Sequence, residues 1–477
     1  MTKPAWAIRW ALCTFLFLAS SCGEGPRESF ATQPQVEIDL QAIRERGVLN
    51  ALVDNNSVSY FIYRGQPMGY EYELLQLFSK FLKVSLKITL ISGVEEAIDR
   101  LNKGQGDLIA FPLTVTRERK KYIDFTTAHF TTSQVLVQRK PESWRENPAM
   151  AERELIRNPA DLIGKEVHVM KQSAFKERLE NLSDEIGGEI MIVEDSADAE
   201  TESLIRRVAN GEIPYTVADQ MLGMVNATYY PNLDVGTVLS LPQQIAWAVR
   251  KNAPQLREAT DEWLKQLKKQ GTLRVIYDKY FNSPRTSVIR MSSDYSSLSG
   301  GKISKYDDLL KEGASQLGWD WRLLAAIVSR ESNFNPQVES WAGAIGLMQL
   351  MPDTGDQFDV DNLYDPKQNI KAGVLFLKHL DELWSRTIAD QNERLKFVLA
   401  SYNVGLSHVV DARNLAKKNG ADPLVWDNQV EFYLLQKSKP QYYKDPVVAA
   451  GYCRCEGPVH YVKDVLARYE EYKTHIK

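Results

Sequence analysis

A change of periodicity past the middle of the chain constrains the fold more than any other feature. Between residues 45 and 282, apolar strand-like runs such as GVLNALVD (Gly47–Asp54) alternate with amphipathic helical runs such as EYELLQLFSKFL (Glu71–Leu82). After residue 302 the strand signals fade, and apolar residues recur at helical spacing. Alternating strands and helices favour a parallel sheet covered by helices. We therefore expect a multidomain α/β + α protein.

The alternation restarts after Lys140, which predicts two α/β lobes that close about a cleft. Asn282–Gly301 is rich in Ser and Gly and has little periodicity, as is typical of an interdomain linker. A length of 477 residues allows two to four domains. The predicted parts are a signal at 1–22, a tether at 23–44, the two-lobed α/β domain at 45–282, a linker at 283–302 and the helical domain at 303–477.

The first 22 residues have the composition of a secretory signal. Lys3 and Arg9 precede a short apolar run that ends in Ser20-Ser21-Cys22, and this run is too short to span a bilayer. Small residues before a Cys resemble a bacterial lipobox, which implies lipidation of Cys22; simple cleavage is the alternative. We expect an exported protein on the periplasmic face of the outer membrane, peripheral or lipid-anchored.

Charge and cysteine content exclude several classes of function. The formal net charge of -4 gives no basic footprint for nucleic acid. Cys453 and Cys455 lie two residues apart, and because such a disulfide would be strained, we expect two unpaired thiols. No further Cys or His stands at ligand spacing, so no metal site is expected.

The segment LTVTRERKKYIDFT (Leu113–Thr126) carries a T-x-x-R pattern that ends in Arg119. A guanidinium can hold a carboxylate through two parallel hydrogen bonds. The segment resembles that of the family 3 extracellular solute-binding proteins. The resemblance implies that Arg119 binds a ligand carboxylate, that Asp219 of Val217-Ala218-Asp219 binds the ligand ammonium, and that Thr114 supplies a hydroxyl.

One carboxyl in the helical half stands out. Glu331 follows an apolar helical run in which Leu324, Ile327 and Val328 share its face. A carboxyl that leaves an apolar face is desolvated, which raises its pKa and suits it to act as a general acid. A solvent-facing Glu at a helix end is the alternative.

The residues after Glu331 favour the first of these alternatives. ESNFNP, SWAGAIGLMQLMP and SYNVG resemble the soluble lytic transglycosylase (goose-lysozyme-like) domain. That resemblance implies that Glu331 is the single catalytic acid/base. It also implies saccharide-binding roles for Ser340, Gln349, Met351, Tyr402 and Tyr461.

Both domains behind a signal resemble the family of membrane-bound lytic murein transglycosylases F. The resemblance implies cleavage of peptidoglycan glycan strands to a 1,6-anhydromuramyl product, without metal or cofactor. It also suggests an N-terminal domain that binds an amino acid or muropeptide and regulates cleavage. A hydrolytic muramidase and a non-catalytic sensor remain as alternatives.

Overall fold

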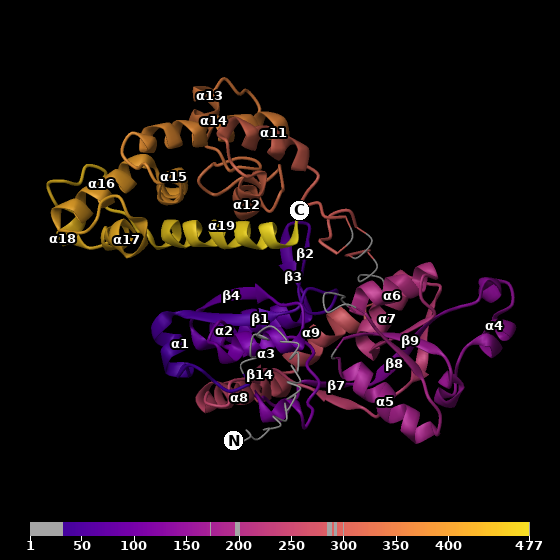
Figure 1. Ribbon diagram of the computed structural model, residues 1–477. Coiled ribbons are helices and arrows are strands. Elements are labelled where there is room, and N and C mark those ends of the chain that lie inside the picture. Colours follow the sequence, from indigo (N-terminus) through magenta and orange to yellow (C-terminus); the bar gives the residue numbers. More distant parts are fainter. Residues whose placement is uncertain are drawn as a thin grey trace, which may run out of the picture.

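The computed structural model describes residues 32–171, 173–195, 201–283, 289–290, 293–298 and 300–476. Two α/β lobes precede a helical domain, which confirms the predicted fold class (Figure 1). The predicted signal and Cys22 lie outside the described residues. Within the described residues, no helix is both long and apolar enough to cross a membrane.

Lobe 1 is built on a five-stranded sheet in the order β4-β1-β5-β14-β6. The first three strands are parallel, as predicted, whereas β14 pairs antiparallel with β5 and β6. The prediction of a wholly parallel sheet is wrong here because the chain re-enters lobe 1 after building lobe 2. The elements of lobe 1 are α1 (Leu40–Arg46), β1 (Val48–Val53), β2 (Phe61–Tyr63), β3 (Gln66–Met68), α2 (Tyr70–Leu82), β4 (Ser85–Leu90), α3 (Val94–Asn102), β5 (Leu108–Ile109), β6 (Asp124–Phe125), β14 (Ala248–Val249), α8 (Pro254–Gln270) and α9 (Thr272–Phe281).

Lobe 2 has a second mixed sheet in the order β10-β9-β11-β8-β12, in which β9 is parallel to both of its neighbours. The antiparallel strands β7 and β13 join the lobes. The chain passes from lobe 1 to lobe 2 through β7 and returns through β13. The elements are β7 (Phe130–Thr132), β8 (Gln134–Arg139), α4 (Pro148–Glu154), β9 (Glu166–Met170), α5 (Ala174–Ile186), β10 (Met191–Asp195), α6 (Thr201–Asn210), β11 (Tyr215–Asp219), α7 (Gln220–Tyr229), β12 (Leu233–Val238) and β13 (Gln243–Ile245).

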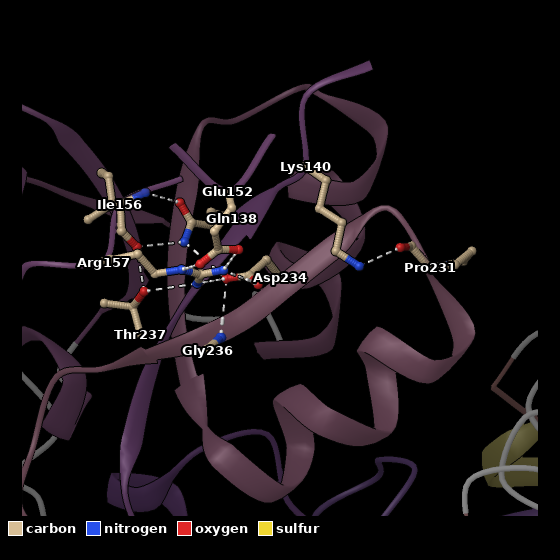
Figure 2. Close-up of polar contacts among 9 residues, drawn as sticks. All are labelled: Gln138, Lys140, Glu152, Ile156, Arg157, Pro231, Asp234, Gly236 and Thr237. Carbon is tan, nitrogen blue, oxygen red and sulfur yellow. Dashed lines mark hydrogen bonds and ion pairs between the residues drawn. The ribbon is translucent and has the colours of Figure 1, made fainter. Parts of the chain in front are cut away.

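A polar cluster ties the excursion between β8 and β9 to the sheet of lobe 2 (Figure 2). Arg157 bridges Glu152 of α4 and Asp234 of β12, with N–O distances of 2.5 and 2.6 Å. The Gln138 side chain exchanges two hydrogen bonds with the backbone of Ile156, at 3.0 and 2.9 Å. This network fixes the outer edge of lobe 2.

Part of the predicted tether belongs to lobe 1. The Asp39 carboxylate accepts hydrogen bonds from Leu40 N and, at 2.8 Å, from Leu256 N, so it caps both α1 and α8. The Val36 carbonyl accepts from Asn252 Nδ2 at 2.9 Å. The tether prediction is therefore wrong for residues 36–44, because these contacts come from residues about 215 positions later, which local sequence does not reveal.

The helical domain surrounds α12, whose residues from Leu323 to Ser329 are all buried. Asp320 caps this helix by accepting from Arg322 N at 2.9 Å, and Asn333 ends it in the left-handed conformation with φ of 50°. The helices are α11 (Asp307–Leu317), α12 (Trp321–Ser332), α13 (Pro352–Gln357), α14 (Pro366–Ser385), α15 (Gln391–Val404), α16 (Leu406–Lys418), α17 (Glu431–Gln436), α18 (Pro440–Tyr443) and α19 (Glu456–His475).

Cys453 and Cys455 form a disulfide just before α19. The expectation of two unpaired thiols is wrong, because the intervening turn brings the two Cα atoms to 5.3 Å. This separation lies within the usual range for disulfides.

The β2–β3 hairpin projects from lobe 1 onto the helical domain (Figure 1). At its tip, Gln66 Nε2 donates to Ser329 Oγ at 3.0 Å and to Asn333 Oδ1 at 2.9 Å. The Gly65 carbonyl accepts from Arg468 of α19 at 2.8 Å. Buried apolar residues of lobe 1 and of the helical domain form one continuous cluster. The two domains are therefore packed together.

The described part of the linker also pairs with the hairpin. Arg64 N donates to the Tyr295 carbonyl at 2.8 Å, and Ser297 N donates to the Ile62 carbonyl at 2.9 Å. The described part of the predicted linker is thus hydrogen-bonded to the hairpin where it passes it.

Candidate active site and ligand cavity

Glu331 lies in the last turn of α12, two residues before the helix ends at Asn333. Ser332 beside it is buried, and its hydroxyl donates to the Leu347 carbonyl at 2.8 Å. This bond joins the end of the helix to the loop that carries Ser340 and Gln349. The helix therefore fixes Glu331 against that loop.

The environment of Glu331 favours its protonated form. Burial raises the pKa of its carboxyl to about 7, and the nearby Tyr461 hydroxyl and Arg330 guanidinium oppose this shift in part. Among the described residues, the buried Tyr461 hydroxyl has no partner at hydrogen-bonding geometry. A carboxyl with a pKa near neutrality can both donate and accept a proton at the same pH.

Two tyrosines accompany Glu331. Tyr402 of α15 donates its hydroxyl to the Met348 carbonyl at 2.7 Å, and Tyr461 of α19 is 2% exposed. Burial and the charge of Glu331 both raise the pKa of each hydroxyl well above its usual value. Three helices thus converge on one carboxyl, as the helical spacing and the motifs predict. Both tyrosine hydroxyls therefore stay neutral near pH 7.

Ser340 closes a tight turn in the loop after α12. Its hydroxyl accepts from Ala344 N at 2.9 Å, and Gly343, at the turn, has φ of 86°. Gln349 Nε2 donates to the Val338 and Gly346 carbonyls at 3.1 and 3.0 Å. Ser340 and Gln349 therefore hold the loop, and their saccharide-binding roles stay predictions.

Met351 follows this loop at the start of α13 and is 45% exposed. An exposed, flexible thioether there is available to a bound chain. Its contact with saccharide also stays a prediction.

Asn369 of α14 organises the same loop and was not predicted from the sequence. Its fully buried amide accepts from Met348 N at 2.8 Å and donates to the Ile345 and Leu363 carbonyls at 3.0 and 2.8 Å. A polar residue among the apolar positions of NIKAGVLFL is the signal that could have revealed it. Asn369 positions the GLMQ segment beside Tyr402.

A cavity of about 440 Å³ lies between lobes 1 and 2, and Thr114, Arg119 and Asp219 all line it. Arg119 Nη1 donates to the Thr114 carbonyl at 2.9 Å, which orients the guanidinium. Burial lowers the pKa of Arg119 to about 10, although Asp219 opposes this shift, and burial raises the pKa of Asp219 to about 7. The structure therefore brings the three predicted ligand residues together.

Four further carboxyls line this cavity and were not predicted as site residues, and two of them lie on its inner wall. Asp54 follows β1, and Glu202 lies in the first turn of α6. In the sequence, Asp54 is predicted only as the end of a strand. Its place at the carboxyl end of that strand is the available signal, because ligands of open α/β sheets bind at that edge.

Comparison with known proteins agrees with the two-part architecture. The model of bacterial extracellular solute-binding proteins, family 3, matches residues 49–283, and that of the transglycosylase SLT domain matches residues 308–425. Among solved structures, an arginine-binding protein mutant from T. maritima aligns with a TM-score of 0.44 and 25% identity, covering 52% of this chain and 100% of that one.

Relatives match along nearly the whole chain. A membrane-bound lytic murein transglycosylase F from Desulfosudis oleivorans is 34% identical, covering 90% of this chain and 91% of the relative. A relative of the same name from Stutzerimonas stutzeri is 32% identical, and the match covers 97% of this chain and 90% of the relative. The chain therefore belongs to the membrane-bound lytic murein transglycosylase F family.

Proposed function

We propose that this protein cleaves the β-1,4 bond between N-acetylmuramic acid and N-acetylglucosamine in peptidoglycan without water, leaving a 1,6-anhydromuramyl end. The observation that carries the proposal is the setting of Glu331. Among the described residues, the groups that shift its pKa are Tyr461 and Arg330, and neither is a carboxyl. A single buried acid with a pKa near 7 suits a reaction assisted by the substrate's own N-acetyl group, which needs only one enzymatic carboxyl.

One carboxyl can serve both steps of such a reaction. Protonated Glu331 donates its proton to the glycosidic oxygen while the muramyl N-acetyl oxygen attacks C1, so the C1–O bond breaks and an oxazolinium forms. Glu331, now ionised, takes the proton of the muramyl 6-hydroxyl. That oxygen attacks C1, the oxazolinium opens, and the 1,6-anhydro ring closes. No water is consumed, and Glu331 ends protonated as it began.

The products of digested peptidoglycan test this proposal. Mass spectrometry should find 1,6-anhydromuramyl products. Products heavier by one water molecule would instead identify a hydrolytic muramidase and overturn the nonhydrolytic reaction.

Substitution of the single acid tests whether the site is catalytic. We expect Glu331→Gln to lose about 10³-fold or more of peptidoglycan clearance, because the amide cannot exchange the proton. Glu382→Gln, an exposed change of the same charge on α14, should clear peptidoglycan at the wild-type rate. Clearance by a folded Glu331→Gln variant at the wild-type rate would support a non-catalytic sensor.

We also propose that the inter-lobe cavity binds an amino acid or a peptide fragment of the cell wall and regulates cleavage. Arg119 and Asp219 offer opposite charges to the two ends of a zwitterion. Calorimetry with amino acids and stem peptides tests binding, and clearance rates with and without the bound compound test regulation. Binding that leaves the clearance rate unchanged would contradict regulation.

The β2–β3 hairpin supports this coupling. Asp54, Asn55, Asn56 and Val58 line the cavity, and the chain leads from them into the hairpin. Gln66 of the hairpin bonds to Ser329 and Asn333, on either side of Glu331 in the sequence. A ligand regulates the enzyme only if it binds two arrangements of these parts with different affinity. The hairpin is the element through which such a difference would reach α12.

We further propose that the protein is exported and associates with the periplasmic face of the outer membrane, peripherally or through lipid on Cys22. The composition of residues 1–22 and the relatives' name support this location. Replacing Cys22 by Ser should move a lipid-anchored protein from the membrane fraction to the soluble fraction. Unchanged fractionation would favour peripheral association.

A further inference from the structure

The inter-lobe cavity holds more negative than positive charge. The ionisable residues that line it comprise five carboxyls and two cations, namely Asp54, Glu95, Glu96, Glu202 and Asp219 against Arg119 and Lys171. Glu95 and Lys171 are exposed, and Glu96 pairs with Arg100 at 2.8 Å. The remaining charges are three carboxyls and one guanidinium, all of them only partly exposed to solvent.

These partly exposed groups form two separate poles. Arg119 interacts electrostatically with Asp219, and this pole matches the carboxylate and ammonium of an α-amino acid. Asp54 interacts instead with Glu71 and Glu202. The second pole is negative, with the Arg206 guanidinium near Glu202 as its one partial counter-charge among the described groups that act on these two carboxyls. An ordinary zwitterion bound at the first pole adds no further cation to it.

Asp54 has unused hydrogen-bonding capacity. Its Oδ2 accepts from Asn56 Nδ2 at 2.6 Å, whereas its Oδ1 is buried and makes no hydrogen bond within the described part of the chain, although the Ser59 hydroxyl lies near the carboxyl. Burial, with Glu71 and Glu202 nearby, raises the pKa of Asp54 to about 7. A buried oxygen without a partner destabilises the site unless a ligand donates to it.

The second pole also spans the two lobes. Glu202 of lobe 2 accepts from Ser57 N of lobe 1 at 3.3 Å and from Asn226 Nδ2 at 3.0 Å. Asp54 and Glu202 thus face the same region from opposite lobes. A cation placed between them would be attracted to both lobes at once and would favour their closure.

We propose that the ligand carries a second cationic group, an amine or guanidinium on an aliphatic side chain, which is held between Asp54 and Glu202. Much of the remaining wall is apolar, which suits methylene groups, and includes Phe111, Phe130, Met221, Leu222 and Phe281. An organic cation fits better than a metal ion, because no three His, Cys, Asp or Glu side chains of the described residues converge to hold one.

This inference rests on the proposed amino-acid binding at Arg119 and Asp219, and calorimetry on the full-length protein separates the two. L-Lysine and L-norleucine share a backbone and a chain length, but only lysine has a terminal ammonium. At pH 8 we expect lysine to bind about tenfold or more tightly, the size of one hydrogen bond to a charged group. Equal binding of both would overturn the second cation and leave the amino-acid site intact, whereas no binding of either would overturn both.

A substitution locates the effect. Asp54→Asn keeps the shape of the side chain and should lower lysine affinity about tenfold while leaving norleucine affinity unchanged. Glu118→Gln, an exposed change of the same charge beside Arg119, should alter neither affinity. A lysine preference that survives in a folded Asp54→Asn variant would overturn the assignment to Asp54.

meso-Diaminopimelate distinguishes a free basic amino acid from a cell-wall diamino acid. Its far end carries a carboxylate as well as an ammonium, so it returns negative charge to the Asp54 pole. We expect it to bind more weakly than lysine. Tighter binding than lysine would overturn a purely cationic side-chain pole.

Discussion

At the scale of single residues, the sequence indicated the chemistry of Glu331 but not all of the residues that shape the two sites. Helical spacing predicted an apolar neighbourhood for this carboxyl, and burial does raise its pKa. The motifs pointed to Tyr402 and Tyr461, which lie beside it. Asn369, Asp54 and Glu202 escaped prediction because their importance comes from partners that are distant along the chain.

The pKa of Glu331 predicts how activity depends on pH. The first step needs the protonated acid, so kcat/KM should fall as pH rises through about 7, the pKa that burial gives Glu331. Initial rates of clearance across pH 5 to 9 measure this limb. A rate that is level from pH 6 to 8 would contradict a general acid with this pKa.

The same shift predicts a pH-dependent stability. The folded protein holds the Glu331 proton up to about pH 7, whereas the unfolded chain loses it near its ordinary value of 4.5. The folded state therefore binds more protons between these values, and stability falls as pH rises through this window. Glu331→Gln should melt above the wild type at pH 8 and level with it at pH 4, in thermal unfolding followed by circular dichroism.

At the scale of elements, the order of helices and strands was accessible from periodicity, while several pairings were not. The antiparallel β14 departs from the predicted parallel sheet because its neighbours in space come from both ends of the α/β region. The short β2 and β3 escaped because three-residue strands carry little periodic signal. The loop after α12 was identified by its motif, but its shape depends on α14 and α15.

Asn369 makes that dependence testable. Asn369→Ala would leave Met348 N and two carbonyls without their buried partner. We expect the free energy of unfolding to fall by about 2–4 kcal/mol. Denaturant unfolding measures the loss, and Asn392→Ala, an exposed change on α15, is the control.

The effect of Asn369→Ala on catalysis shows whether Asn369 positions the active-site loop or only stabilises the fold. Because the loop would loosen beside Glu331, kcat should fall in conditions where the variant is fully folded. An unchanged kcat with reduced stability would restrict Asn369 to a structural role.

At the scale of the whole molecule, the sequence predicted which domains occur and in what order, but not that they are packed together. The interface depends on Gly65, which has φ of 72° and leaves no room for a side chain against Phe334 and Tyr472. Helical and strand periodicity describes neighbours along the chain, so it contains no information about this contact.

Gly65→Ala should therefore loosen the interface. Gly47 has the same φ of 72° but nothing within 4 Å of an added Cβ, so Gly47→Ala measures the backbone strain alone, about 1–2 kcal/mol. Small-angle scattering should show a larger radius of gyration for Gly65→Ala only. Equal behaviour of the two variants would mean that the contact at Gly65 does not hold the domains together.

The hairpin contact also has a consequence for how the chain folds. Tyr472 donates to the Gly65 carbonyl across 407 residues of sequence, so one partner is synthesised near the start and the other near the end. Contacts of such long range form late. The C-terminal end of the helix that carries Tyr461 can therefore dock on the hairpin only once lobe 1 has folded, so the interface between the two domains should form late in folding.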